Sequence, residues 1–483
     1  MLQKAVKLQE LYVDGSWLST SEQAFGNSMN PATEELIGHY ALATPEQVNR
    51  AVASAQVGFK QWRNTSIPER AAFLWKAAEL FEKRQHELAE MMTKEMGKIL
   101  AESLGEVEVV IETCRYMAGE GRRLFGETVP SSALNRHIMM VREPVGIVAC
   151  ITPWNFPVAL AGYKIFAALI TGNSVVWKPA SETALSAGIF TEILHESGLP
   201  AGVFNLITGA GSKVGSQLAS HRDIKVISFT GSTEVGIALN EMAAKQLKRV
   251  SLELGGKNAA IVLQDANIDQ AAEAIVKAAF STSGQKCTAT SRVIVDRLIK
   301  DDLLEKVKEL TKDLRIGNGL QPDSQIGPLV NKDQLHTVDK YVKTAIQEGA
   351  VLEYGGQPAD QEQGYFYLPT ILSGVRPNHT IAKEEIFGPV LAFIEVDSYE
   401  ESIKVNNDTI YGLSTSIFTE SLHFANRAAK EIESGLVYIN NGTANAELGV
   451  AFGGFKMSGN GHREVSHHSF DLMTEWKSIY TTF

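Results

Sequence analysis

The stretch Val145-Gly-Ile-Val-Ala-Cys-Ile-Thr152 decides the fold, because it is the first of six short apolar runs that alternate with helical segments. The other five are residues 174–180 (SVVWKPA), 203–209 (VFNLITG), 225–231 (KVISFTG), 250–256 (VSLELGG) and 259–263 (AAIVL). Apolar strands separated by helices of about 10–15 residues form parallel sheets that are covered on both faces. The clearest crossover helices are residues 157–171 and 233–245. The sequence therefore predicts an α/β, doubly wound nucleotide-binding fold.

Segments before this region carry signals for a hairpin and for helix starts. Asp14-Gly15 stands between short apolar runs within residues 11–18, and a type I′ turn needs positive φ at both central residues, so a β-hairpin is predicted. Residues 44–47 (TPEQ) and 66–69 (SIPE) each have the pattern of a capped helix start. The second start precedes an amphipathic run, residues 70–98, that we expect to form one long helix.

A second alternation of helices and strands begins after Gly256. The predicted elements are a helix at 268–280, a strand at 291–295, a helix at 300–313 and a strand at 390–396. This pattern indicates another α/β unit with its own core. The segments 122–142 and 470–483 are rich in β-forming residues, and we expect one to be an arm that pairs with the other or with a partner subunit.

Composition excludes several classes of protein. The 483 residues include 45 Lys and Arg against 56 Asp and Glu, a net charge of −11 that argues against a nucleic-acid polymer as the main partner. The most apolar stretch, residues 158–177, is interrupted by Lys164, Gly172 and Asn173, so no membrane span is expected. The first residues lack the apolar core of a signal peptide. Three cysteines cannot form a disulfide framework, so we expect a cytoplasmic protein. The length of 483 residues corresponds to about three domain equivalents.

Two glycine-rich turns follow predicted strands. Residues 229–236 (FTGSTEVG) open a helix, and residues 209–215 (GAGSKVG) have the spacing G-x-G-x-x-x-G. Backbone N–H groups and the helix dipole at such a turn can hold a pyrophosphate. Neither segment matches the G-x-G-x-x-G fingerprint of dinucleotide-binding folds. The alternative interpretation is that these glycines only make tight turns between strand and helix.

The three cysteines lie in different surroundings. Cys287 lies in a segment of small and polar residues beside Lys286, and a nearby cation on an exposed loop lowers the pKa of a thiol, as a nucleophile requires. Cys150, within the apolar run 145–152, is predicted to be a buried core thiol. Cys114, on a helical stretch, is interpreted as structural.

Three polar residues stand at the ends of predicted strands. Glu253 is either solvated at its strand end or acts as a base in the crevice where such folds bind ligands. Asn155 lies between two prolines and suits an oxyanion donor, although capping of the next helix is the simpler interpretation. Lys178 reaches either a ribose or phosphate oxygen or the solvent. The eleven histidines show no ligand spacing, so no metal site is predicted.

Taken together, these segments resemble the aldehyde dehydrogenase superfamily across essentially the whole chain. The matching motifs occur in the family's order: Pro153-Trp-Asn-Phe-Pro157, Trp177-Lys-Pro-Ala180, Phe229-Thr-Gly-Ser-Thr233, Leu252-Glu-Leu-Gly-Gly-Lys257, Gly284-Gln-Lys-Cys287, Glu384-Glu-Ile-Phe-Gly-Pro389 and Phe452-Gly-Gly-Phe-Lys456.

The resemblance implies a subunit of three parts. A Rossmann-like cofactor domain would comprise residues 1–121 and 143–255, a catalytic α/β domain residues 256–456, and a β oligomerisation arm residues 122–142 and 457–483. In the family the arm adds strands to a neighbouring subunit, which implies a homodimer or homotetramer.

The resemblance also implies catalytic roles. Cys287 would attack the aldehyde carbon, and the Asn155 amide with the Cys287 N–H would hold the oxyanion. Hydride loss to the nicotinamide would leave a thioester, and Glu253 would activate the water that hydrolyses it to a carboxylic acid. Lys164 and Glu464 match positions that assist proton movement in some relatives.

A further set of residues is implied to bind NAD or NADP. By resemblance, the cofactor-binding residues are Thr152, Trp154, Lys178, Ser181, Gly211, Thr230, Gly231, Ser232, Glu385 and Phe387. Many relatives that prefer NAD carry a glutamate three residues after the lysine that corresponds to Lys178. Here that residue is Ser181, with Glu182 one step later, so nothing at that position repels a 2′-phosphate and NADP is expected to be accepted.

The substrate is predicted to be a semialdehyde. Residues 284–292 look most like the 2-oxoglutarate semialdehyde dehydrogenase branch, whereas Tyr163 replaces the arginine that succinate semialdehyde dehydrogenases place before the lysine of this helix. The loop 440–450, which by resemblance lines the substrate tunnel, matches neither branch closely. The residues expected to line the substrate site are Phe156, Tyr163, Lys286 and Thr288.

Three alternatives stay open at this point. The first is that the substrate is an aromatic or aliphatic aldehyde. The second is the acylating branch, which transfers the thioester to coenzyme A, although its members generally lack the glutamate at the position of Glu253. The third is a non-catalytic binding protein on the same fold, which could lose Cys287, Glu253 or Asn155 without penalty; all three are present.

Overall fold

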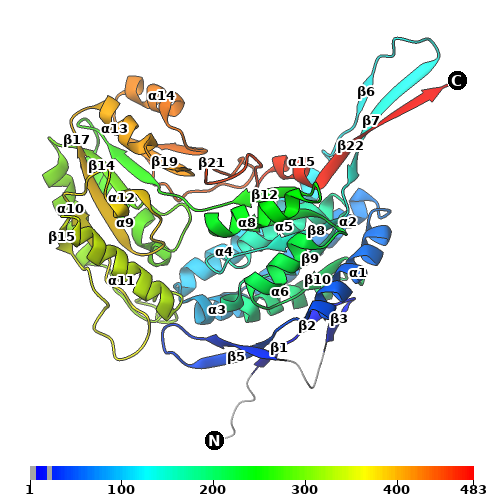
Figure 1. Cartoon of the computed structure of the whole chain (residues 1–483), viewed down its shortest axis with the longest axis horizontal. Helices are drawn as coiled ribbons and strands as arrows, with labels where there is room; N and C mark the ends of the chain where they lie inside the picture. Colours follow the sequence, from blue (N-terminus) through cyan, green and yellow to red (C-terminus); the bar gives the residue numbers. More distant parts are fainter. Residues whose placement is uncertain (1–6, 19–23) are drawn as a thin grey trace, which may run out of the picture.

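A computed structural model describes residues 7–18 and 24–483 of the chain. Residues 1–6, which belong to the stretch predicted to lack a signal peptide, and residues 19–23 lie outside the described part. Two α/β units lie side by side, and a β arm projects from one of them (Figure 1). The architecture confirms the α/β class predicted from the alternating apolar runs.

The first unit contains a seven-stranded sheet in the order β12-β11-β8-β9-β10-β2-β3. Its strands are β2 (Leu11–Val13), β3 (Ser16–Leu18), β8 (Ile147–Ile151), β9 (Ser174–Lys178), β10 (Phe204–Leu206), β11 (Ile224–Thr230) and β12 (Arg249–Glu253). The five strands from β12 to β10 are parallel, and β2 and β3 continue the sheet antiparallel. Asp14 and Gly15 both have positive φ, 58° and 77°, so the predicted hairpin with its Asp-Gly turn is confirmed.

Successive residues of the central strand β8 serve two different cores. Val148 and Cys150 belong to one apolar cluster, and Ile147, Ala149 and Ile151 belong to another. Side chains alternate between the two faces of a strand, so both faces of this sheet are buried. The helices of this unit are α1 (Pro45–Trp62), α2 (Ile67–Lys83), α3 (Gln85–Met96), α4 (Leu100–Gly121), α5 (Ala159–Ile170), α6 (Ala184–Glu196), α7 (Ser216–Ser220) and α8 (Thr233–Ala244).

The single long helix predicted for residues 70–98 is wrong. The chain leaves helical geometry at Arg84, with φ −103° and ψ 16°, so α2 and α3 are separate helices. The Arg84 guanidinium is bound by Glu87 at 2.7 Å and, on α6, by Glu192 at 2.7 Å and Glu196 at 2.8 Å. Apolar periodicity continues across the break because both helices pack on the same unit, and it therefore hides the bend.

The second unit contains a sheet in the order β15-β16-β17-β14-β13-β19-β20, parallel except for β15. Its strands are β13 (Ala259–Val262), β14 (Arg292–Asp296), β15 (Val351–Tyr354), β16 (Thr370–Ser373), β17 (Val390–Val396), β19 (Ser414–Phe418) and β20 (Leu436–Ile439). Its helices are α9 (Ile268–Phe280), α10 (Lys300–Lys312), α11 (Lys332–Gln347), α12 (Thr380–Lys383), α13 (Tyr399–Asn407) and α14 (Leu422–Glu431). The apolar run 259–263, grouped above with the first sheet, thus forms the middle of the second.

The arm is a three-stranded antiparallel sheet in the order β22-β7-β6, with strands β22 (Thr474–Thr482), β7 (Arg136–Pro144) and β6 (Glu127–Val129). The pairing of β7 with β22 confirms that the two β-rich segments pair with each other (Figure 1). A short helix, α15 (Phe470–Met473), precedes β22. Two smaller sheets complete the fold: β1 (Lys7–Gln9), β5 (Leu36–Ala41) and β4 (Phe25–Met29); and β18 (Tyr411–Gly412) with β21 (Phe455–Lys456).

Candidate active site

The parallel register of the first sheet brings four predicted site residues to one edge. Ile151, at the end of β8, lies opposite Phe229 on one side and Lys178 on the other. Thr230 in turn lies opposite Glu253. The carboxyl ends of parallel strands form the crevice where such folds bind ligands, and Thr152 follows directly after β8.

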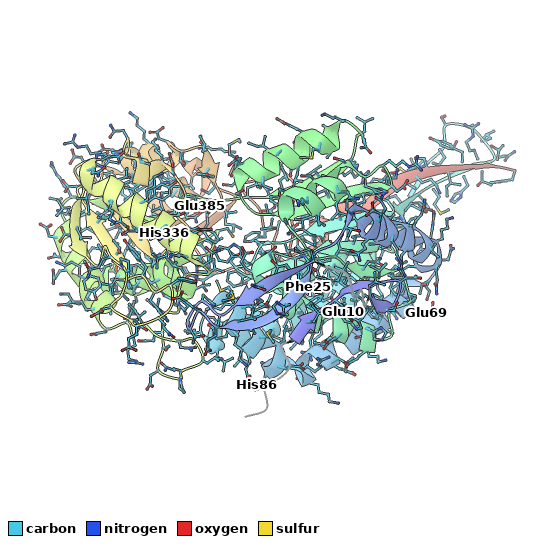
Figure 2. The ribbon with its side chains drawn as sticks, turned by 60° about the horizontal axis from the view of Figure 1, so that its bottom comes forward. Glu10, Phe25, Glu69, His86, His336 and Glu385 are labelled. Atoms are coloured by element: carbon cyan, nitrogen blue, oxygen red, sulfur yellow. The ribbon has the colours of Figure 1, made fainter. Side chains whose placement is uncertain are left out.

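A cavity of about 360 Å³ lies where this edge meets the second unit. Its lining residues are Pro153, Trp154, Asn155, Thr230, Gly231, Ser232, Leu254, Gly255, Cys287, Gln334, Glu385 and Phe387. Figure 2 shows Glu385 on the second unit together with His336, whereas Glu69 and His86 lie on the first. Residues that are far apart in the sequence, on both units, therefore meet at the Cys287 thiol.

A second cavity of about 490 Å³ continues from the first, since Pro153, Thr230, Gly231 and Ser232 line both. It also contains Thr152, Lys178, Ser181, Glu182, Gly211, Ser212, Gly215 and Glu234. The two glycine-rich turns of the sequence thus face one elongated cleft. All ten residues expected to bind the cofactor line one cavity or the other.

The cleft suits a dinucleotide. Ser232 caps helix α8 by accepting the Val235 N–H, and the start of this helix, with Ser232, Glu234 and Val235, lines the cleft where a phosphate could bind. Gly211 lies beside Lys178, whose Nζ would be 4.0 Å from a Cβ built on that glycine. Burial lowers the pKa of Lys178 to about 8. At the other end, the rings of Trp154 and Phe387 meet edge to face at 5.3 Å.

Cys287 does not have the environment predicted from its neighbour Lys286. Burial and, to a smaller extent, the carboxylates of Glu385 and Glu253 together raise the pKa of the Cys287 thiol to about 12. The Lys286 ammonium donates instead to the Ser281 hydroxyl. Proximity in sequence suggested that a cation activates the thiol, but the Lys286 side chain lines another cavity.

Asn155 presents its amide to the same cavity as the thiol. Its Nδ2 donates one hydrogen bond of 3.1 Å to the backbone oxygen of Gln285, two residues before Cys287. An amide nitrogen carries two protons, so one remains to be donated. This geometry fits an oxyanion donor better than a helix cap, because no Asn155 side-chain bond to helix α5 is formed.

Glu253 is buried at the end of β12, and neither of its carboxylate oxygens accepts a hydrogen bond from any described residue. Burial raises its pKa well above the ordinary value, and the Glu464 carboxylate adds to this shift. Lys164 binds Glu464 at 2.6 Å, and the Ser228 hydroxyl donates to the same carboxylate at 2.9 Å. The Lys164 ammonium opposes the effect of Glu464 and lowers the pKa of Glu253.

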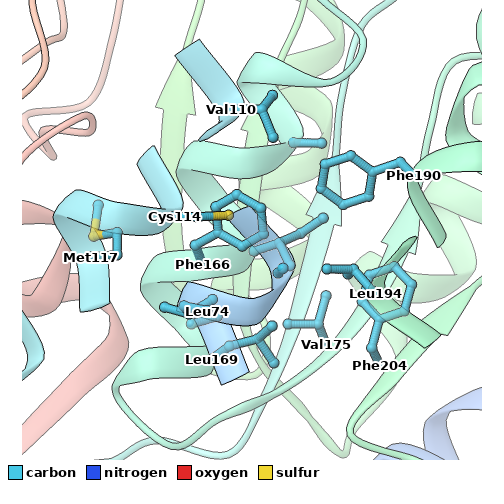
Figure 3. Close-up of a cluster of buried hydrophobic side chains, with 14 of the residues drawn as sticks. Leu74, Val110, Cys114, Met117, Phe166, Leu169, Val175, Phe190, Leu194 and Phe204 are labelled. Atoms are coloured by element: carbon cyan, nitrogen blue, oxygen red, sulfur yellow. The ribbon is translucent and has the colours of Figure 1, made fainter. Parts of the chain in front are cut away.

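The other two cysteines are buried core thiols. Burial raises the pKa of Cys150 to about 12 and that of Cys114 well above its ordinary value. Figure 3 shows Cys114 packed in the apolar cluster that contains Val110, Phe166 and Phe190. Unlike Cys287, neither thiol lines any of the cavities described in this section, so the structural role expected for Cys114 and Cys150 fits their positions.

A third cavity, of about 130 Å³, adjoins the segment before Cys287. Its lining residues are Ala274, Lys277, Ala278, Ser281, Lys286, Asn441, Gly442, Ala444 and Asn445. Sequence reasoning identified Lys286 and the loop 440–450 but missed Lys277, which has the appearance of an ordinary polar residue on the amphipathic helix α9. Phe156, Tyr163 and Thr288 line none of these three cavities, and neither do Glu253 and Lys164.

Within residues 7–18 and 24–483, no group of three or more His, Cys, Asp or Glu side chains is arranged to hold a metal ion. None of the helices in this part of the chain is both long and apolar enough to cross a membrane.

Comparison with known proteins agrees with this geometry. The model of the aldehyde dehydrogenase family matches residues 17–479. The alpha-ketoglutaric semialdehyde dehydrogenase of Bacillus subtilis is 42% identical over 473 residues, covering 97% of each chain. Among solved structures, 3,6-anhydro-L-galactose dehydrogenase in complex with NADP has a TM-score of 0.96 at 36% identity, covering 99% of this chain and all of that one.

A second solved structure, an NAD-dependent aldehyde dehydrogenase from Sinorhizobium meliloti, has a TM-score of 0.96 at 35% identity over 99% of this chain and 95% of that one. Family, relatives and structural neighbours agree over nearly the full length. They support an enzyme that oxidises an aldehyde with NAD or NADP as cofactor. The chain belongs to the aldehyde dehydrogenase family.

Proposed function

We propose that the protein oxidises an aldehyde with an anionic tail to the carboxylic acid, through a thioester on Cys287. The observation that carries this proposal is the cavity shared by Cys287, Asn155, Glu385 and Phe387, which continues into the glycine-lined cleft. NAD or NADP, when bound in that cleft, supplies the hydride acceptor. The Cys287→Ala variant described in the Discussion tests the proposal.

The thiol and the amide act first. Cys287 sulfur attacks the aldehyde carbon and its proton leaves to water, which gives a thiohemiacetal whose oxyanion accepts the free Asn155 N–H. When this adduct collapses, its C–H bond breaks, the hydride would pass to NAD or NADP bound in the cleft, and a thioester remains on Cys287. Glu385 and Phe387, which line the cavity together with Cys287, would hold the ribose and the nicotinamide ring of the cofactor.

Water completes the reaction. Glu253 takes a proton from water, the hydroxide adds to the thioester carbon, and Cys287 leaves as the thiolate. The overall balance is aldehyde, oxidised cofactor and water in, carboxylic acid, reduced cofactor and a proton out. The two carboxylate oxygens of Glu253 accept no hydrogen bond from any described residue, so they suit this role. The ion pair of Lys164 with Glu464 adjusts the pKa of Glu253, because Glu464 raises this pKa and Lys164 lowers it.

The third cavity supports an anionic substrate. Lys277 and Lys286 line this cavity together with Asn441 and Asn445, next to the segment that carries Cys287. Such a set binds a carboxylate at the far end of a short aldehyde and compensates for the arginine that Tyr163 replaces. A semialdehyde is also the substrate named for the relative from Bacillus subtilis. A contribution of Phe156, Tyr163 and Thr288 to the substrate site stays a prediction, since none of them lines these cavities.

Replacing Lys286 or Lys277 by methionine should test the substrate class. Each change is expected to lower kcat/KM for 2-oxoglutarate semialdehyde by about 10-fold or more, because a charge-assisted hydrogen bond contributes about 1.5–3 kcal/mol. With hexanal the change should stay below about threefold. Steady-state kinetics with both aldehydes measures the ratio, and Lys312→Met, on the exposed end of α10, is the matched control.

An aromatic or aliphatic aldehyde is the competing substrate. A panel in which benzaldehyde or hexanal exceeds both 2-oxoglutarate and succinate semialdehyde tenfold in kcat/KM would reverse the assignment. Equal loss with hexanal and semialdehyde in Lys286→Met would assign that lysine to Cys287 rather than to the substrate tail.

We further propose that NADP is accepted alongside NAD. Ser181 and Glu182 both line the second cavity, with Lys178 nearby. Ser181→Glu is expected to lower kcat/KM with NADP by about 30-fold, since a carboxylate beside a 2′-phosphate costs about 2 kcal/mol at a partly solvated distance. The value with NAD should change less than about threefold. Ser181→Gln, of the same size without the charge, is the control, and wild-type kcat/KM for NADP more than about a thousandfold below NAD would refute the proposal.

We propose that the arm joins subunits of a homodimer or homotetramer, as in the family. Trp476 and Tyr480 are 47% and 64% exposed on β22, which is an edge strand of the arm. The division into cofactor domain, catalytic domain and arm, at the bounds given above, stays a prediction, as does the cytoplasmic location. Sedimentation of the intact protein, compared with a Trp476→Glu variant, measures the oligomeric state.

A further inference from the structure

The loop that carries Asn155 is held from outside the site by a buried ion pair. We infer that Lys98 and Glu106 are positioning residues for the oxyanion donor: together they fix the backbone of Asn155 and the start of helix α5. Neither residue lines the cavities described above, and neither belongs to a motif of the sequence analysis. The inference rests on the proposed role of Asn155.

Glu106, on helix α4, binds the start of α5. Its Oε1 accepts the N–H groups of Val158 at 2.8 Å and Ala159 at 2.9 Å. These are the first N–H groups of the helix, which has no side-chain cap of its own. A carboxylate at this position accepts hydrogen bonds from N–H groups that have no partner within the helix, and its negative charge interacts favourably with the helix dipole. Glu106 therefore fixes the end of the turn that begins at Pro153.

Lys98 fixes the middle of the same turn. Its Nζ donates to the backbone oxygen of Asn155 at 3.0 Å and is paired with Glu106. The ammonium also lies over the Phe156 ring, 4.6 Å from the centroid. The side chains of Lys98 and Glu106 have no exposed surface. Two contacts from the turn and the Glu106 carboxylate thus meet at the Lys98 ammonium, whose side chain has no exposed surface.

The position of Lys98 is itself set by the second unit. Residues 97–99 link α3 to α4, and Gly97 has φ 94° with space for no Cβ, since one would lie 2.7 Å from Pro328. The N–H of Leu100 donates to the Gly319 oxygen at 2.9 Å. Residues 97–99 are therefore packed against Gly319 and Pro328, which belong to the unit that carries Cys287.

Two independent bonds then fix the Asn155 residue. The Gln285 oxygen accepts from the side-chain amide, so that nitrogen and not oxygen faces this carbonyl. Lys98 binds the backbone oxygen of Asn155, so the peptide group that follows the Asn155 Cα is held in one orientation. An oxyanion donor stabilises the transition state only when it is held at hydrogen-bonding distance beforehand. A displacement of about 1 Å at such a donor lowers the rate by about 100-fold.

A double-mutant cycle tests the inference. Lys98→Met and Asn155→Ala are made singly and together, and formation of NAD(P)H in a single turnover is measured at saturating aldehyde. Asn155→Ala alone should lower the rate by about 100- to 1,000-fold. Lys98→Met should lower it by about 10- to 100-fold in the wild-type background, but by less than about threefold when Asn155 is already alanine.

A second variant and a second readout separate positioning from damage to the fold. Lys98→Met with Glu106→Gln removes both charges and keeps an amide oxygen for the Val158 N–H, so this variant should fold even if the single one does not. Its single-turnover rate should fall by the same factor as in Lys98→Met. The rate of Cys287 alkylation by iodoacetamide should stay within about twofold of wild type, because that reaction needs no oxyanion donor.

The outcomes are distinct. Three results would each overturn the positioning role. The first is that Lys98→Met lowers the single-turnover rate equally in the wild-type and Asn155→Ala backgrounds. The second is that the rate of Cys287 alkylation falls in parallel, and the third is that a folded Lys98→Met variant turns over at the wild-type rate. An Asn155→Ala variant with wild-type rate would overturn the proposed function of Asn155 itself. A slow Asn155→Ala variant together with an unimpaired Lys98→Met variant would overturn only the present inference.

Discussion

Replacing Cys287 by alanine is expected to lower kcat for aldehyde oxidation by at least about 10⁴-fold, because the covalent intermediate can no longer form. Cys287 is the only thiol that lines the cavity among the described residues. The fold and the binding of NAD or NADP should be retained, since the change to alanine removes a single sulfur atom. Steady-state formation of NAD(P)H and fluorescence titration of the cofactor measure the two effects.

Cys114→Ala provides the matched control for the thiol. Cys114 lies in the apolar core, away from both cavities, so this variant should keep its turnover at the cost of some stability. Iodoacetamide should inactivate the wild type and the Cys114→Ala variant alike, and prior substrate should protect both. Activity of Cys287→Ala above about one hundredth of wild type would refute the nucleophile, and so would inactivation traced to Cys114.

Glu253→Gln is expected to form one NAD(P)H per active subunit in a burst and then to turn over about 100- to 1,000-fold more slowly than wild type. The thioester forms without the base, but its hydrolysis requires a proton acceptor for water. Glutamine has the same size and cannot accept the proton. Rapid-mixing absorbance at the wavelength of the reduced cofactor separates the burst from the steady state.

The pH profile gives a second test of the base. Burial and the neighbouring Glu464 raise the pKa of Glu253 well above its ordinary value. Only the unprotonated carboxylate accepts a proton, so kcat should rise with pH through that pKa and fall as pH decreases below it. This acid limb should be absent in Glu253→Gln. Full steady-state activity of the variant, or an unchanged acid limb, would remove Glu253 from the role of base.

Residues at strand ends could be placed from the sequence because the carboxyl ends of neighbouring parallel strands always lie at the same edge of a sheet. Once residues 145–152, 174–180 and 225–231 are read as neighbouring parallel strands, their carboxyl ends must meet. Thr152, Lys178 and Thr230 therefore belong to one crevice without any further assumption. The second glycine turn, which matched no known fingerprint, faces the same crevice for the same reason.

The surroundings of single side chains could not be predicted in the same way. Lys286 is next to Cys287 in sequence, yet its ammonium binds Ser281 and the thiol pKa is raised. Side-chain direction within an irregular segment depends on backbone angles that no periodicity encodes, such as the positive φ of Thr282 and Ser283. Lys98 and Glu106 were missed because a lysine in a helix link and a glutamate on a helix are ordinary surface residues in any sequence.

The bond between Lys164 and Glu464 joins residues 300 positions apart. Strand β22 pairs with β7 across a similar interval. During synthesis, a ribosome that has finished both α/β units has therefore not yet supplied the residues that complete the site beside Glu253 or the third strand of the arm. Contacts of such long sequence separation form slowly and late. The Lys164–Glu464 pair and the pairing of β7 with β22 can therefore form only after residues 464–482 have been synthesised.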